Sequence, residues 1–286
     1  MAIIYAIALI QDDESKVMAK EGLERTRAYL KSLGRFGKCA FLRPLYGGAS
    51  EVAQAFCRAC AVHGGVYMLN QPIKKYLLNE DKSQCLGIVT GEGQQIKSKW
   101  IIGSMEYMNE DWLQTGSLDT GATWVSRAII VSNLPPISHE GSDMEDISFA
   151  VFPPTSSGDS SQAVTAIQLS SEGMSCPRQK YMTFLSTPST NSEQSSKVDL
   201  AAAVDSLQKS NIAMKPLFVL YYKLRSQKSS IVASDKAPKN VIACSDPDRL
   251  LDLDAPLTEA RKTFAYCVGE NEDFLPAPEV DPELEE

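Results

Sequence analysis

The sequence predicts a mixed α/β fold, in which strands and helices are interspersed along the 286 residues of the chain. Short apolar runs bounded by Ser, Pro, Gly and Asn clusters occupy much of the region after residue 70, which is typical of strands. Longer segments elsewhere repeat their apolar residues at helical spacing. Strands interspersed with helices in this way indicate an α/β or α+β domain.

The first elements are predicted to be helical. Residues 15–33 are expected to form a helix, because Met18 and Leu30 lie on one side and Gly34 follows as a stop signal. Residues 1–9 are expected to belong to a preceding helix. This apolar start has no basic region and no small-residue cleavage site, so it is not expected to be a signal peptide.

A further helix is predicted after residue 49. Gly47 and Gly48 can adopt backbone angles closed to other residues, so the chain can turn sharply before the helix. Ser50 is a favourable N-cap, and Glu51 lies near the positive end of the helix dipole. Small and apolar side chains then recur at helical spacing and give the helix one apolar face: Val52, Phe56, Ala59, Cys60 and His63.

The same helix is predicted to end at Gly64, which suits a left-handed C-cap, and the chain is expected to continue as a strand over residues 66–69. Glu51 and Arg58 are seven residues apart, roughly two turns, so they share the polar face. An acid and a base on the outward side of a helix could bind a partner, but most exposed charges are simply solvated. The spacing alone leaves both interpretations open.

Beyond Asn70 the pattern is mostly that of strands. Nine are predicted, over residues 73–78, 85–90, 95–102, 124–131, 147–152, 163–169, 181–186, 217–224 and 241–244. The glycines of Gly91-Glu92-Gly93 are expected to form a turn between two of them. Helices are predicted over residues 198–209 and 256–267, the second with Pro256 in its first turn.

The net charge of −8 is concentrated in one segment. Residues 270–286 contain eight acids and no Lys or Arg, so they account for the whole of it. A body without a basic excess argues against nucleic-acid binding. No apolar run approaches the roughly 18 residues of a membrane-spanning helix, so no membrane span is expected.

Seven cysteines without regular spacing favour reduced thiols and a cytoplasmic location. Cys57 and Cys60 form a C-x-x-C motif in the middle of the predicted helix, where small buried side chains are a better interpretation than a redox pair. With His63 and His139 as the two histidines, no metal site is predicted. Neither a hydrolase G-x-S-x-G motif nor a G-x-G-x-x-G dinucleotide loop occurs, so no catalytic residue and no cofactor is predicted.

The segment from Leu42 to Ile73 resembles the one shared by Rab escort proteins and Rab GDP-dissociation inhibitors. It contains Pro-Leu-Tyr-Gly, Glu, Gln, Phe and Arg, then Gly-Gly, Tyr and Met, in that order. The resemblance implies a partial fold of the dissociation-inhibitor type, with a sheet domain related to flavin-dependent oxidoreductases and a smaller helical domain. It also implies a Rab-binding platform formed by Glu51, Arg58 and Met68. A further platform position, often threonine in the family, is Val66.

Other motifs are similar to the escort proteins in particular, namely Leu33-Gly34-Arg35-Phe36-Gly37, Phe56-Cys57-Arg58-Ala59-Cys60 and Cys244-Ser245-Asp246-Pro247-Asp248. The resemblance therefore implies a non-catalytic accessory component of Rab geranylgeranyl transferase. Such a protein binds Rab GTPases in their GDP form, presents them to the transferase and acts in vesicle-mediated transport. Two alternatives are a dissociation inhibitor that recycles prenylated Rab proteins and an inert fragment of an escort protein.

The resemblance also predicts the domain organisation. Residues 1–34 are expected to be the remnant of the helical domain, residues 35–269 the sheet domain with its platform, and residues 270–286 a disordered acidic tail. The Gly-rich strand-turn-helix that begins full-length members is absent, so the chain is expected to be truncated at its N-terminus. In the family the helical domain carries the geranylgeranyl lipid pocket and the transferase-docking surface, so Rab binding is expected of this chain alone and those two interactions are not. A flavin oxidoreductase is a weaker alternative, since the dinucleotide loop is missing.

Overall fold

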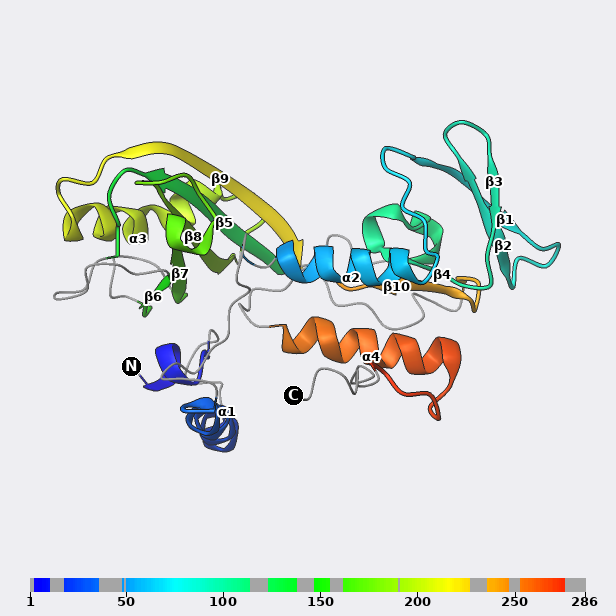
Figure 1. The fold of residues 1–286 in the computed structure, drawn as a ribbon, viewed down its shortest axis with the longest axis horizontal. Helices are drawn as coiled ribbons and strands as arrows, with labels where there is room; N and C mark the ends of the chain where they lie inside the picture. Colours follow the sequence, from blue (N-terminus) through cyan, green and yellow to red (C-terminus); the bar gives the residue numbers. More distant parts are fainter. Residues whose placement is uncertain are drawn as a thin grey trace, which may run out of the picture. The chain divides into compact units, whose positions relative to one another are not determined.

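A computed structural model of the chain describes residues 3–10, 18–35, 48, 50–113, 123–137, 147–154, 162–189, 191–226, 236–246 and 253–275 (Figure 1). The chain divides into two compact units. Unit 1 comprises Met1–Tyr67 and Thr123–Arg225, and unit 2 comprises Met68–Ala122 and Ser226–Glu286. The expected domain limits at residues 34 and 269 stay predictions.

Unit 1 is organised around a five-stranded sheet. Its strands are β5 (Thr123–Ser132), β6 (Ile147–Phe152), β7 (Val164–Leu169), β8 (Tyr181–Ser189) and β9 (Pro216–Ser226), in the order β6-β7-β8-β5-β9. β7 pairs antiparallel with both β6 and β8, and β8 pairs antiparallel with β5. All five segments were predicted as strands, because each combines apolar residues with turn residues at its ends.

One helix, α3 (Ser196–Ser210), covers one face of this sheet (Figure 1). The register places Ala166, Leu185 and Ala128 in one row across β7, β8 and β5. The alanines of that row are small, which lets the helix side chains approach the sheet closely. The resulting core contains Leu200, Ala203, Val204 and Leu207 of the helix, all buried. The helix predicted over residues 198–209 is therefore confirmed.

The N-terminal part of unit 1 is helical, as predicted. A short π-helical segment, η1 (Ile3–Ile7), buries Tyr5 and is followed by the buried residues Ala8 and Ile10. The helix α1 (Ala19–Ser32) matches the described part of the expected helix over residues 15–33 and buries none of its residues. Its Gly22 faces the side chain of Ile10, so α1 lies against the segment that follows η1.

Unit 2 contains a three-stranded meander. β1 (Ile73–Leu78), β2 (Cys85–Thr90) and β3 (Gln95–Lys97) pair antiparallel in chain order. The predicted turn between two of them is confirmed. The amide of Gly93 donates to the carbonyl of Thr90 at 2.9 Å, with Gly93 at φ +90°, a conformation that favours glycine.

The predicted strand over residues 95–102 was wrong in one respect, because it is two strands in different sheets. β3 ends at Lys97, whereas β4 (Ile101–Ser104) pairs in parallel with β10 (Val241–Cys244). Asn240, just before β10, fixes this arrangement. Its buried side-chain amide exchanges hydrogen bonds with the backbone of Cys85 and donates to the carbonyl of Lys99 at 2.7 Å. The chain must therefore leave the meander after β3.

The helix α4 (Asp254–Val268) is attached to the same part of unit 2 by polar and aromatic contacts. The Tyr266 hydroxyl donates to the carbonyl of Lys239 at 3.2 Å, and its ring meets that of Trp100 edge-on at 5.5 Å. Glu259 accepts from the amide of Ser245 at 2.8 Å. The short helical turns η3 (Met105–Tyr107) and η4 (Glu110–Trp112) each contribute a residue to the unit's buried core. Among the described residues, this core consists of Cys85, Met105, Met108, Trp112, Leu113, Ala237, Val241 and Ala243.

Candidate functional site

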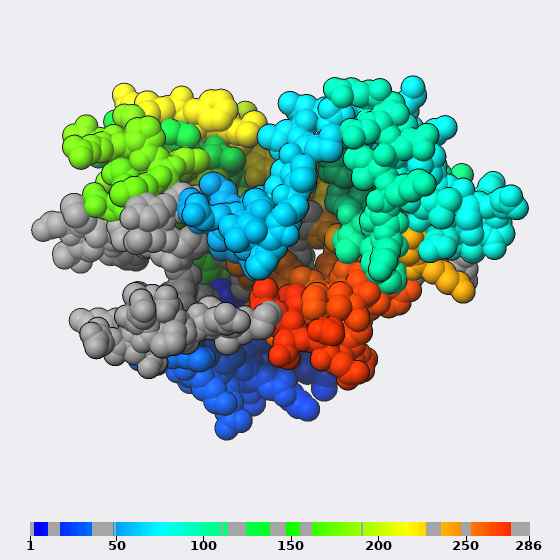
Figure 2. Space-filling model, turned by 45° about the vertical axis from the view of Figure 1, so that its right-hand side comes forward, coloured from blue at the N-terminus to red at the C-terminus, as the bar shows by residue number. Residues whose placement is uncertain are grey.

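The helix α2 (Ser50–Val62) carries the predicted platform residues Glu51 and Arg58. Figure 2 shows its light-blue atoms at the surface. None of its residues is buried, and Phe56 on the expected apolar face is 54% exposed. The described part of unit 1 therefore places no packed core against this helix, and both of its faces can be reached from solvent.

Local backbone geometry holds the C-terminal end of α2. Ser50 is the first residue of the helix and not the predicted N-cap, and residues 47 and 49 lie outside the described residues. At the other end Gly64 has φ +85° and its amide donates to the carbonyl of Ala61 at 3.0 Å. The amide of Gly65 donates to the carbonyl of Cys60 at 2.8 Å. These two bonds form a Schellman motif, which confirms the predicted C-cap.

Because α2 is regular from Ser50 to Val62, Glu51 and Arg58 lie on the same side of it, about 10 Å apart along the axis. Gln54 lies between them on that side, three residues after the acid and four before the base, and spacing alone could have identified it. Within the described part of the chain, neither charged side chain makes an ion pair or a side-chain hydrogen bond. Both charges are therefore available to a partner.

The predicted strand over residues 66–69 is wrong, since these residues are irregular and pair with no strand in the described chain. A strand needs a neighbour for its backbone hydrogen bonds, which a local apolar pattern does not reveal. Val66 is 83% exposed and Met68 is 46% exposed. Val66 belongs to unit 1 and Met68 begins unit 2, so a surface common to Met68, Glu51 and Arg58 stays a prediction.

The expected burial of Cys57 and Cys60 is also wrong. Both are free thiols on exposed residues, because nothing in the described chain packs over their side of α2. The Tyr67 phenol lies close to the thiols of Cys60 and then Cys57, and its interaction with them raises the pKa of Tyr67. Three polar side chains thus meet at the end of the helix.

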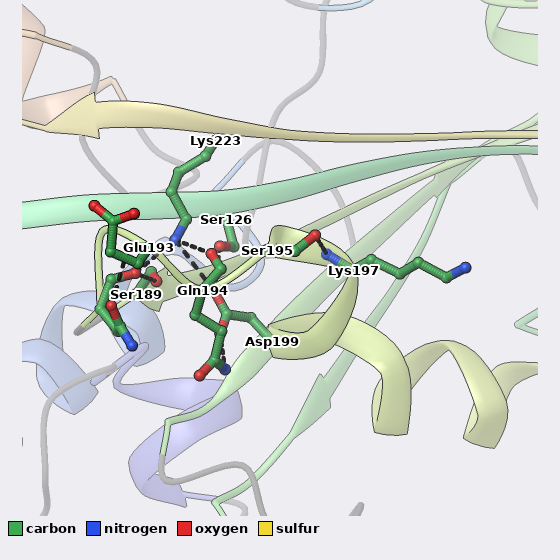
Figure 3. Close-up of polar contacts among 9 residues, drawn as sticks. Ser126, Ser189, Glu193, Gln194, Ser195, Lys197, Asp199 and Lys223 are labelled. Carbon is green, nitrogen blue, oxygen red and sulfur yellow. Dashed lines mark hydrogen bonds and ion pairs between the residues drawn. The ribbon is translucent and has the colours of Figure 1, made fainter.

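A second polar cluster, at the start of α3, is structural (Figure 3). The Lys223 ammonium donates to the carbonyls of Asn191 and Gln194 and lies 3.9 Å from a carboxylate oxygen of Asp199. That carboxylate also accepts from the hydroxyl of Ser126. Lys223 and Asp199 are only 14% and 11% exposed, and Ser126 is fully buried. No substrate could reach this serine, so the cluster fastens the loop before α3 to the sheet.

The described residues contain neither a metal-binding cluster nor a helix that could span a membrane. Among them, no group of three or more His, Cys, Asp and Glu side chains could hold a metal ion. Each described helix is too short or too polar to cross a membrane. His63 is exposed just after α2, and His139 lies outside the described residues.

Comparisons with known proteins agree on one family. The family described as GDP dissociation inhibitor matches residues 2–236. The chain is 30% identical to mouse (Mus musculus) Rab proteins geranylgeranyltransferase component A 2 over 289 residues, which cover 96% of this chain and 44% of that protein. It is 33% identical to the probable secretory pathway GDP dissociation inhibitor 1 of Schizosaccharomyces pombe over 184 residues, 64% of this chain and 39% of that protein.

A solved structure agrees on the fold. The Rab GDI of Plasmodium falciparum superposes with a TM-score of 0.68 at 18% identity, covering 96% of this chain and 57% of that one. This confirms the expected mixed α/β fold of the dissociation-inhibitor type. The chain spans less than half the length of the curated relatives it matches.

Proposed function

Since this chain belongs to the GDP dissociation inhibitor family, we propose that it binds Rab GTPases in their GDP form and acts as a Rab escort protein. The observation that carries the proposal is the exposed helix α2, which presents Glu51 and Arg58 on one side, neither paired with a side chain of the described residues. A recognition surface of this kind gains specificity and a faster association rate when the partner carries charges of opposite sign facing it. Val66 and Met68 add exposed apolar area of the sort that partners bury.

The proposed mechanism is non-catalytic. Without a γ-phosphate, the switch segments of a GTPase are not held in their ordered form. A platform that binds this form keeps the Rab protein inactive and leaves its C-terminus free for prenylation by Rab geranylgeranyl transferase. Each buried CH₂ of a prenyl chain is worth about 0.8 kcal/mol, so the modified protein needs a chaperone in the cytoplasm.

The relatives support an escort protein over a dissociation inhibitor. Matches to mammalian geranylgeranyltransferase component A cover 96% of the chain, whereas the matches to yeast dissociation inhibitors cover 64%. The escort function is therefore the main proposal. Because less than half of the relatives' length is represented, lipid binding and transferase docking are not proposed for this chain alone.

A titration of the purified chain against one Rab protein tests the proposal. The Rab protein is loaded with GDP in one arm and with a non-hydrolysable GTP analogue in the other. Binding that strongly favours GDP is expected. Equal binding to the two forms would contradict nucleotide-dependent recognition, and binding to neither would support the alternative of an inert fragment.

A further inference from the structure

The last two turns of α2 place two thiols close together. Cys57 and Cys60 are three residues apart on a regular helix and both are exposed. Helix geometry puts their Cα atoms about 5 Å apart, because three residues rise about 4.5 Å and rotate by nearly a full turn. That separation falls within the range of about 4.4–6.8 Å that disulfides span.

The surroundings of both thiols are defined by residues just after the helix. Both thiols lie close enough to the Tyr67 hydroxyl to raise its pKa, which agrees with two side chains three residues apart on neighbouring turns of the helix. A Cβ at Gly65 would come within 2.2 Å of the Cys60 sulfur, so this thiol lies directly over the Gly65 backbone. The Schellman motif thus brings the backbone of Gly65, which has no side chain, against the Cys60 thiol.

We propose that Cys57 and Cys60 form a dithiol modification site, which a small disulfide such as glutathione disulfide oxidises to a disulfide within the helix. The thiolate of one cysteine attacks a glutathione sulfur and releases one glutathione thiolate, which takes up a proton. The second cysteine, as its thiolate, then attacks the mixed disulfide and releases the second glutathione. Two protein thiols are oxidised and one glutathione disulfide is reduced to two thiols.

Two physical arguments favour this pair over the other described cysteines. Cys85 is buried and Cys176, Cys244 and Cys267 are half-buried, and burial raises the pKa of all four thiols, which lowers their thiolate fraction. Cys57 and Cys60 are exposed and also have each other within reach, so the second step is intramolecular.

The disulfide is expected to be reversible. Side chains three apart on a helix have Cβ atoms about 5–6 Å apart, whereas a disulfide needs about 3.5–4.5 Å. Closing the bond must therefore tighten the end of α2. Strained, exposed disulfides are reduced more readily than structural ones. The inference does not depend on the proposed function, since it concerns the chain without any partner.

Trypsin provides a direct test, because Arg58 lies between the two cysteines. The folded chain carrying Cys39→Ser is incubated with glutathione disulfide, then denatured, alkylated and digested. Cleavage after Lys38, Arg58 and Lys74 puts the two cysteines on separate peptides, residues 39–58 and 59–74. Cys39→Ser is needed because residue 39 lies on the first peptide. Mass spectrometry without reductant should show the two peptides joined, and dithiothreitol should separate them.

Matched variants test whether the link joins Cys57 to Cys60 and whether it depends on Gly65. Cys57→Ser and Cys60→Ser should each abolish the joined peptides, whereas Cys267→Ser should leave their yield unchanged. Gly65→Ala, which displaces the Cys60 sulfur, should lower the yield while Gly22→Ala leaves it unchanged, because a Cβ at residue 22 meets only an ordinary contact at 3.7 Å. Glutathione adducts on both cysteines without a link, or no reaction at either, would overturn the proposal.

Discussion

The acid and the base of α2 stand seven positions apart on one side of the helix, and no other charged residue is present on it. Helical periodicity makes such a pair predictable from sequence, because the angle between two positions depends only on their spacing. Exposure is a different matter. The same periodicity suggested that Cys57 and Cys60 would be buried, yet both are exposed, since burial depends on what packs against the helix.

Reversing the charge of Glu51 tests its place in the platform. Glu51→Arg is expected to weaken binding to the GDP-loaded Rab protein by more than about 1 kcal/mol, or about fivefold in Kd, if the acid meets a partner charge at the interface centre. Isothermal titration calorimetry measures the change. Glu80→Arg is the matched control, because Glu80 is an exposed acid in a turn of unit 2 and its reversal alters the net charge equally. Equal affinities for the two variants would remove Glu51 from the platform.

Among the secondary-structure elements, strand existence was predictable and strand pairing was not. The strands β5 to β8 occupy the expected runs because alternating or continuous apolar residues between turn signals are a local property. The segment 66–69 has the same local pattern but pairs with no strand among the described residues, and β4 pairs with β10, 140 residues later in the chain. Partners so distant in sequence leave no local signal.

Lys223 is predicted to stabilise the folded state by its contacts at the start of α3. Lys223→Met would leave the Asp199 carboxylate without its cation and two backbone carbonyls without a donor, in surroundings that are nearly closed to water. We expect the free energy of unfolding to fall by about 3 kcal/mol or more. Urea unfolding followed by circular dichroism measures it. Lys197→Met, an exposed lysine at the same end of α3, should change it by less than about 0.5 kcal/mol. A similar loss of unfolding free energy for both variants would contradict a structural role for the contacts of Lys223.

The whole molecule comprises two units with separate hydrophobic cores. Thermal unfolding is therefore expected to show two transitions in calorimetry, with a calorimetric enthalpy larger than the van't Hoff enthalpy of either. Leu200→Ala should lower the midpoint of one transition and Val241→Ala that of the other, because each side chain is fully buried in a different unit. If both substitutions lower the same single transition, the units unfold together.

Unit 2 is predicted to lose stability in alkali. Burial raises the pKa of the Cys85 thiol, and burial and then Cys85 itself raise that of the Tyr76 phenol, so both stay protonated in the folded state at a pH where the unfolded chain ionises. The unfolded state then binds fewer protons, so stability is full below the ordinary thiol pKa and falls above about pH 8.5. Midpoints measured at several pH values test this.

Two substitutions isolate the groups responsible for that pH dependence. Cys85→Ser retains a donor for the carbonyl of Gly87, which the thiol reaches at 3.2 Å, but has no ionisation in this range. Tyr76→Phe removes the phenol that donates to the carbonyl of Tyr107. Cys85→Ser should flatten the decline above about pH 8.5, and Tyr76→Phe should flatten the part of it above about pH 10. A decline that is unchanged in both variants would assign it to other groups.

The sequence by itself determined the mixed α/β class, the extent of most helices and strands, the Gly64 cap of α2 and the spacing that puts Glu51 and Arg58 on one side. These features depend on residues within a few positions of one another, so local conformational preference and periodicity suffice. Only the tertiary structure decided that β4 leaves the meander for β10, that residues 66–69 form no strand, and that Cys57 and Cys60 face solvent beside Tyr67. Pairing and burial depend on contacts between distant parts of the chain, and no short stretch of sequence contains both partners of such a contact.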